Sequence, residues 1–120
     1  MAAKLSGSDA RKAEALEEAR RKWDHVRALV ERVASGGGGD SVTLMRHIGR
    51  AATDVARVLQ NNGFGGLGQS AAELATVVQR AKLSQGKLRT MREQVAGVRG
   101  AIDNAERLLH KGGGEDAPSD

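Results

Sequence analysis

Apolar residues recur every three or four positions along most of this chain, and no segment alternates between apolar and polar residues. The first spacing is typical of one face of an α-helix, and alternation is typical of a half-buried strand. Glycine-rich segments at 35–40 and 61–68 interrupt the pattern, and such segments end helices. The sequence therefore predicts an all-α fold with helices over 8–34, 41–60 and 69–110.

The first two segments differ in the width of their apolar stripe. The stripe of 8–34 follows the strict 3-4 spacing of coiled-coil a and d positions, at Leu16, Ala19, Trp23, Val26, Val30 and Val33. The stripe of 41–60 is wider, which suits a helix buried between two neighbours. Asn61-Asn62-Gly63 is a good helix end. These features favour a helical bundle.

The third segment keeps one 3-4 rhythm from Leu74 to Leu109. An unbroken rhythm favours a single helix of about 42 residues, roughly 60 Å long. Ser84-Gln85-Gly86 offers an alternative, because these residues could end one helix and start another. We expect an antiparallel three-helix bundle or coiled coil with a long C-terminal helix, and four helices if that helix breaks near Gly86.

The composition points to one small domain with a thin core. Leu, Ile, Val and Phe account for 24 of the 120 residues, close to the limit below which chains do not fold alone. We expect a single helical domain over 8–111, a disordered N-terminus over 1–7 and a disordered acidic tail over 112–120. A thin core also favours stability borrowed from a partner.

Part of the third helix is expected to lie outside the bundle. Two short helices cannot cover a 42-residue helix unless they lie end to end along it, so an apolar stripe remains for another chain. Trp23 could pack in the core or anchor an interface, and we place core packing first. The predicted protein-interface residues are Trp23, Leu88, Met91, Val95, Val98, Ile102 and Leu109.

Basic residues flank the same stripe. Arg80 and Lys87 fall at g positions and Arg92 and Arg99 at e positions, where charges select coiled-coil partners. A homodimer would place basic residues against basic residues in either orientation. We therefore expect these four residues to select a helical partner with acidic flanking positions, in a hetero-oligomer.

The function predicted from these patterns is that of a non-enzymatic adaptor or structural subunit, assembled by coiled-coil contacts into a larger complex of the trafficking or cytoskeletal kind. The alternative is a self-contained bundle that binds polyanions, nucleic acid or acidic surfaces, through the basic face of its last helix. Aromatic residues are sparse near that face, so nucleic-acid binding would be non-specific.

The spacing G-x-G-x-x-G at Gly63, Gly65 and Gly68 also occurs in dinucleotide-binding folds. That fingerprint works between a strand and a helix of a βαβ unit. Here a helix is expected before it and no strand is expected anywhere. The sequence favours a helix–helix turn in which Phe64 and Leu67 fold back onto the end of the bundle.

Catalytic, metal and cofactor sites are not expected. His25, His47 and His110 are far apart in the sequence, cysteine is absent, and no nucleophile or paired-carboxylate arrangement stands out. No run of 18 apolar residues predicts a transmembrane helix, and no signal peptide is recognisable at the N-terminus. We expect an intracellular, cytoplasmic protein.

Overall fold

The structure, a computed structural model, describes residues 7–36, 41–80 and 84–115. Within these ranges the chain forms helices and short turns, and no strand. The helices are α1 (Gly7–Ser35), α2 (Ser41–Asn61), α3 (Gly65–Arg80) and α4 (Gln85–Glu115). The all-α prediction is confirmed, and the four-helix form is the one that the chain adopts.

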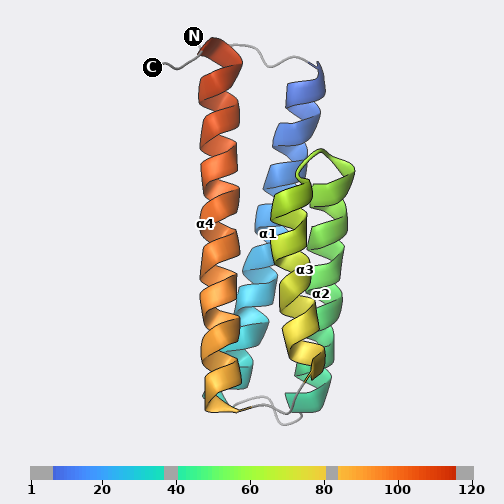
Figure 1. The fold of residues 1–120 in the computed structure, drawn as a ribbon, viewed down its shortest axis with the longest axis vertical. Coiled ribbons are helices and arrows are strands. Elements are labelled where there is room, and N and C mark those ends of the chain that lie inside the picture. Colours follow the sequence, from blue (N-terminus) through green and yellow to red (C-terminus); the bar gives the residue numbers. More distant parts are fainter. Residues whose placement is uncertain (1–6, 37–40, 81–83, 116–120) are drawn as a thin grey trace.

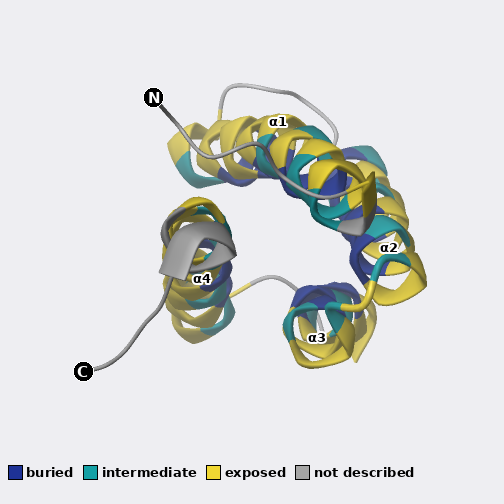
Figure 2. Ribbon diagram, turned by 90° about the horizontal axis from the view of Figure 1, so that it is seen from above, coloured by how far each residue is buried: buried dark blue, intermediate teal, exposed yellow. Residues whose placement is uncertain are grey.

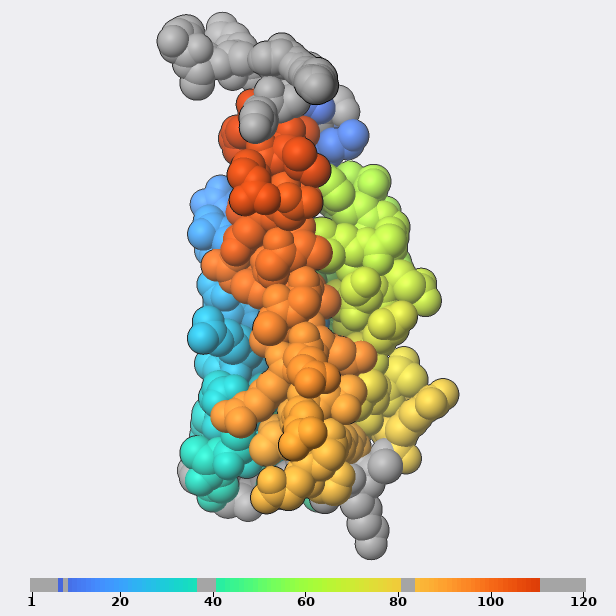
Figure 3. Space-filling model, turned by 60° about the vertical axis from the view of Figure 1, so that its left-hand side comes forward, coloured from blue at the N-terminus to red at the C-terminus, as the bar shows by residue number. Residues whose placement is uncertain are grey.

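The four helices run alternately down and up the long axis of the bundle (Figure 1). Each helix packs against its neighbours in chain order, and α4 closes the bundle by packing against α1. Seen from above, they surround one central core (Figure 2). Figure 3 shows α4 lying along α1 on one side and α3 on the other. The last helix is therefore part of the bundle.

The prediction of one continuous helix over 69–110 is wrong, because α3 ends at Arg80 and α4 begins at Gln85. Ser84 caps α4: its hydroxyl oxygen accepts the Lys87 backbone N–H at 3.1 Å, and its carbonyl accepts that of Leu88 at 2.9 Å. The serine near Gly86 therefore starts a new helix. The apparent single rhythm belongs to two helices that pack antiparallel.

The buried residues of α3 also differ from the predicted stripe. The prediction placed Val77 in the stripe, whereas Val78 is buried and Val77 is only partly buried. Residue 81, the next predicted position, lies outside the described residues. Leu74, the first residue of the predicted stripe, is buried as expected, so the two patterns separate only after it.

The glycine-rich segment forms a tight turn between α2 and α3. Gly63 has a φ of +89°, a left-handed conformation that glycine adopts without strain. The Phe64 backbone N–H donates to the Leu59 carbonyl at 2.9 Å, the long bond of a Schellman helix end. Phe64 and Leu67 are partly buried against the core. The predicted helix–helix turn has this form, and no βαβ unit surrounds it.

Two helix bounds differ from the prediction. The helix α3 begins at Gly65 rather than near Gln69, because the Gly68 N–H already donates to the Phe64 carbonyl at 2.8 Å. The helix α4 continues to Glu115 through three glycines that were expected to stop it. Glycine costs about 1 kcal/mol in a helix but does not forbid it. Disorder was predicted over 1–7 and 112–120, but residues 7 and 112–115 are helical. The remaining terminal residues, 1–6 and 116–120, lie outside the described residues.

One apolar cluster forms the core and draws on all four helices. The whole predicted stripe of α1 is buried, and no polar or charged residue is buried in the described part of the chain. The widest predicted stripe, on α2, faces two neighbours, α1 and α3. The chain thus covers its main apolar faces with its own helices.

Candidate functional site

The residues predicted to form a protein interface lie mostly inside the bundle. Five of them are at most 4% exposed and belong to the core: Trp23, Met91, Val95, Val98 and Ile102. Leu88 and Leu109 are partly buried and pack against the same core. The helices that cover this stripe are α1 and α3 of the same chain. The stripe is therefore occupied, and a partner would need another surface.

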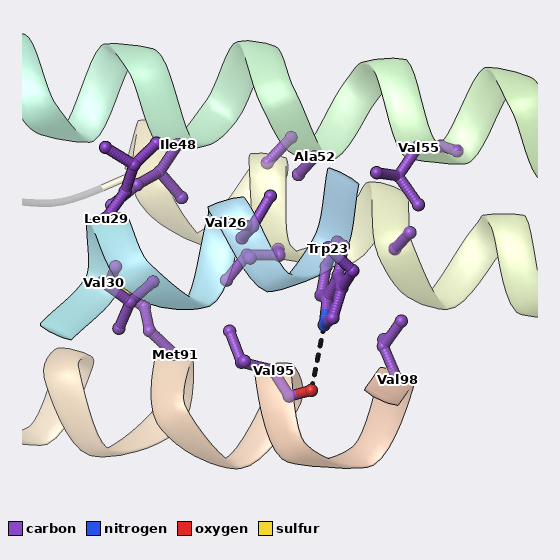
Figure 4. Packing of buried hydrophobic residues seen from close by; sticks show 14 of the residues in the cluster. Trp23, Val26, Leu29, Val30, Ile48, Ala52, Val55, Met91, Val95 and Val98 are labelled. Carbon is purple, nitrogen blue, oxygen red and sulfur yellow. Dashed lines mark hydrogen bonds between the residues drawn. The ribbon is translucent and has the colours of Figure 1, made fainter. Parts of the chain in front are cut away.

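Trp23 joins α1 to α4 at the centre of the molecule. Its side chain is fully buried, and its indole N–H donates to the backbone carbonyl of Val95 at 2.9 Å (Figure 4). A buried indole needs such an acceptor, because an unpaired N–H in an apolar core is costly. Trp23 therefore packs in the core, which we placed ahead of a role as an interface anchor.

Arg92 and Arg99, predicted to select an acidic helical partner, face acidic residues of α1. Arg92 donates to both carboxylate oxygens of Glu31, at 2.9 and 2.6 Å. Arg99 donates to Asp24 at 2.8 Å and also to Asp103 of its own helix. The helix that complements these charges is thus α1 of the same chain.

These contacts change the ionisation of the groups that they join. The hydrogen bond from Arg92 lowers the pKa of the Glu31 carboxyl below its ordinary value. Hydrogen bonds to Glu31 and Asp24 raise the pKa of Arg92 and Arg99, respectively. Arginine is charged at physiological pH in any case, so these contacts favour the charge pairing between α4 and α1.

The other two predicted charges lie close to one end of the bundle. The Lys87 ammonium group donates to the Val78 carbonyl at 3.2 Å, near the end of α3, and partial burial lowers its pKa. Arg80, in the last turn of α3, is exposed. The four predicted charges are therefore divided: two bind α1, one binds α3 and one faces solvent.

Arg80 belongs to a larger group of basic residues at the end of the bundle where α1 and α3 finish and α2 and α4 begin (Figure 1). We call this group the basic end and define it as residues 26–35, 41–50, 73–80 and 85–94. It carries eight Lys and Arg residues and three Asp and Glu residues. The opposite end comprises residues 7–16, 52–61, 65–72 and 101–110. It carries four Lys and Arg residues and five Asp and Glu residues.

The basic end therefore has a net charge of +5, whereas the opposite end has a net charge of −1. Arg27 of the basic end acts on Glu31 through its charge. Within the described residues, five other exposed arginines of this end have no ion-pair partner: Arg32, Arg46, Arg50, Arg80 and Arg89. They come from all four helices. Only the fold brings them together, because they lie up to 57 positions apart in the sequence.

A groove of about 780 Å³ runs along the outer surface of α2 beside the end of α3. Its apolar lining comes from Val42, Met45 and Val78, and Gly49 lies between them. Its basic lining comes from Arg46, Arg50 and Arg57. We call it the α2–α3 groove.

Sequence reasoning did not single out the arginines of this groove. They occur at i, i+4 and i+11 on α2, a helix with one acidic residue, on the side away from most of its apolar stripe. Helical spacing places such residues on one face. That pattern is the sequence signal for these arginines, but the basic residues from Arg80 onward are more closely spaced and give a stronger signal.

No described feature resembles a catalytic or metal centre. His25, His47 and His110 are all exposed and lie on three different segments of the bundle. No group of three or more His, Cys, Asp or Glu residues in the described part of the chain could hold a metal ion. None of the described helices is long and apolar enough to cross a membrane.

Comparison with known proteins identifies no relative: no protein-family description, no curated protein and no solved structure matches this chain.

Proposed function

We propose that this chain is a non-enzymatic binding module that holds a polyanion against the basic end of its bundle. The observation that carries the proposal is the separation of charge along the long axis, +5 at one end and −1 at the other. Such a separation attracts and orients a polyanion from a distance. Close contact then replaces the counterions of its phosphates or carboxylates.

The composition of the basic end supports this function. Arginine binds phosphate and carboxylate oxygens through two parallel N–H groups, which makes it a stronger anion ligand than a single point charge. Of the eight basic residues, seven are arginines. With no exposed aromatic residue among the described residues of this end, base stacking has no support. We expect binding that depends on charge and salt rather than on base sequence.

The adaptor role inferred from the heptads remains a prediction that nothing tests directly. Its proposed contact surface, the α4 stripe, is filled by α1 and α3. A role as an adaptor or structural subunit would therefore have to use another surface. Polyanion binding at the basic end uses arginines that are already exposed, so we place this function first.

The test is a salt titration of binding to a fluorescently labelled DNA duplex and to the corresponding single strand. The logarithm of the binding constant is plotted against the logarithm of the salt concentration. Replacing Arg32, Arg80 and Arg89 together by Gln should reduce the slope by about 2 to 3, because each phosphate contact contributes about 0.9 for duplex DNA. These residues are exposed, so the fold should be retained.

The matched control removes the same formal charge from the opposite end, by replacing Arg11, Lys12 and Arg107 with Gln. This variant should keep most of the salt dependence of the original chain. An equal loss of slope in both variants would mean that net charge alone drives binding, and the assignment to the basic end would be wrong.

A further inference from the structure

We propose that the α2–α3 groove binds an acidic amphipathic helix of a partner protein. The groove shares Arg46 and Arg50 with the basic end but adds an apolar lining, and its ligand is a protein segment rather than a polyanion. This site would give the chain an adaptor contact that does not require its core to open. It goes beyond the polyanion function and can fail independently of it.

The apolar part of the groove lies where α2 and α3 approach closely. At Gly49, an added Cβ atom would lie 3.2 Å from the Val78 side chain, so the glycine permits this close approach of the two helices. Gly49 is buried and Met45 is partly buried. Val42 is 64% exposed, one of the two large hydrophobic residues that are most exposed on the described surface. A water-exposed valine beside a recess favours an apolar occupant.

The arginines give the groove a charged side along the same helix. Arg46 and Arg50 are one helical turn apart, about 6 Å, and Arg57 lies about 10 Å further along α2. Arg57 also contacts Asp54 at 3.3 Å, whereas Arg46 and Arg50 have no ion-pair partner in the described part of the chain. Arg46 and Arg50 therefore present two guanidinium groups without a described ion-pair partner beside the apolar lining of the groove.

An acidic amphipathic helix complements both features at once. Its apolar residues at i, i+3, i+4 and i+7 would cover Val42 and Met45, as in other helix-in-groove complexes. Its flanking carboxylates recur at one-turn intervals and so match the spacing of Arg46 and Arg50. Nucleic acid would satisfy the arginines but leave the valine in contact with phosphates and water. Charge complementarity together with the apolar recess favours the helix.

The first experiment uses three synthetic peptides of about five helical turns. One has a leucine stripe flanked by Glu, the second has the same stripe flanked by Lys, and the third keeps the Glu residues but replaces the leucines with Ser. Binding to the full chain is measured by fluorescence anisotropy. The Glu–Leu peptide should bind at least about tenfold more tightly than either of the others, since each lacks one feature that the groove recognises.

The second experiment exchanges the charge of the groove. Replacing Arg46 and Arg50 with Glu should weaken binding of the Glu–Leu peptide by at least about tenfold and strengthen binding of the Lys–Leu peptide. The matched control is Arg32→Glu with Arg80→Glu, an equal change of charge elsewhere on the basic end. It should alter peptide binding little. Circular dichroism checks that both variants remain helical.

Amide chemical shifts of the full chain locate the bound peptide. Shifts confined to residues 42–57 and the end of α3 support the proposal. Three results would overturn it: no binding of the Glu–Leu peptide at millimolar concentration, equal binding of the Glu–Leu and Lys–Leu peptides, or shifts on α1 and α4 instead.

The two proposals are separated by the same set of variants. Loss of DNA binding in the Arg32, Arg80 and Arg89 variant, with peptide binding intact, supports two sites. Loss of peptide binding in the Arg46 and Arg50 variant, with a DNA salt slope reduced only by about 0.9 for each lost phosphate contact, also supports two sites. If the peptide fails and DNA binding behaves as expected, only the groove proposal falls.

Discussion

The α2–α3 pair and the α1–α4 pair are both antiparallel helix pairs, but they are held together by different means. In the α2–α3 pair the backbones approach closely: an added Cβ at Gly68 would lie 2.9 Å from the Ala56 carbonyl oxygen. In the α1–α4 pair a large side chain, Trp23, fills the space between the helices and bonds across it. The first pair is made of sequence neighbours and the second of segments about 70 residues apart.

The difference explains where binding surfaces remain. The α1–α4 pair uses its charges for itself, because Arg92, Arg99 and Arg20 all contact acidic residues across the interface, at Glu31, Asp24 and Glu106. The α2–α3 pair uses small residues in its interface and leaves Arg46 and Arg50 outside it. The charged residues at the α1–α4 interface are thus paired, whereas Arg46 and Arg50 beside the α2–α3 interface are not paired with any described residue.

The largest effect should come from the α1–α4 pair. Trp23→Ala removes the largest fully buried side chain and should lower the free energy of unfolding by about 3 to 5 kcal/mol. Trp23→Phe keeps an aromatic ring and loses the N–H donor, so its cost should be clearly smaller. Urea denaturation followed by circular dichroism measures both. Equal costs would mean that the hydrogen bond, not the buried volume, holds this pair.

Gly68→Ala should have the next largest effect and tests the close approach of α2 and α3. The added methyl group would meet the Gln60 side chain at 2.6 Å and a backbone carbonyl at 2.9 Å. The helices would have to move apart, at a cost of about 1 to 3 kcal/mol.

Gly66→Ala is the control for this substitution, because it lies in the same helix and an added Cβ has open space around it. It should raise the free energy of unfolding by up to about 1 kcal/mol through helix propensity. Thermal unfolding distinguishes the two glycines by the sign of the change. A stabilising Gly68→Ala would contradict the role assigned to this residue.

Arg99→Gln tests the charges of the α1–α4 pair and should cost no more than about 1 kcal/mol, because the ion pair with Asp24 is partly exposed to water. The cost should shrink in high salt. Arg107→Gln, which removes a contact only with Asn104 of the same helix, is the control and should change unfolding less. A cost that is independent of salt would argue against an ion-pair contribution.

The smallest effect should be a pH dependence at Glu31. Its carboxyl has a lowered pKa in the folded chain, so its contribution to stability is present above the ordinary pKa of 4.5 and is lost as the pH falls through the folded value. Glu31→Gln should therefore destabilise the chain at neutral pH and make little difference in strong acid. Denaturation at several pH values measures this.

Glu17→Gln, at an exposed position of α1 without a described ion pair, serves as the control for Glu31→Gln. Its effect should not follow the pH in the same way. A constant difference between Glu31→Gln and the original chain from neutral to acid pH would exclude the Arg92 contact as a source of stability.

Local features of the sequence predicted much of the fold. The stripe from Leu16 to Val33 is buried as expected, and Gly63 ends α2 as expected, because helix periodicity and a left-handed glycine act within a few residues. Ser84 is a local signal for the break before Gln85, but the 3-4 rhythm continues on both sides of it. Periodicity does not tell whether two in-phase stripes belong to one helix or to two.

The candidate sites were less predictable, because charge pairing across the bundle is a tertiary property. The sequence marked Arg80, Lys87, Arg92 and Arg99 as one basic face, and the fold divided them among α1, α3 and solvent. The fold also places Arg80 and Arg32, from different helices, at the same end of the bundle. No spacing along the chain relates these two residues.

The sequence by itself determined that this protein is helical, where most of its turns lie and which residues of α1 and α2 face the core. Those properties depend on contacts within one or two helical turns. Only the tertiary structure decided that α4 returns to cover Trp23, which charges are neutralised and which are exposed. Those outcomes depend on residues dozens of positions apart, whose approach is set by how four amphipathic faces bury one another.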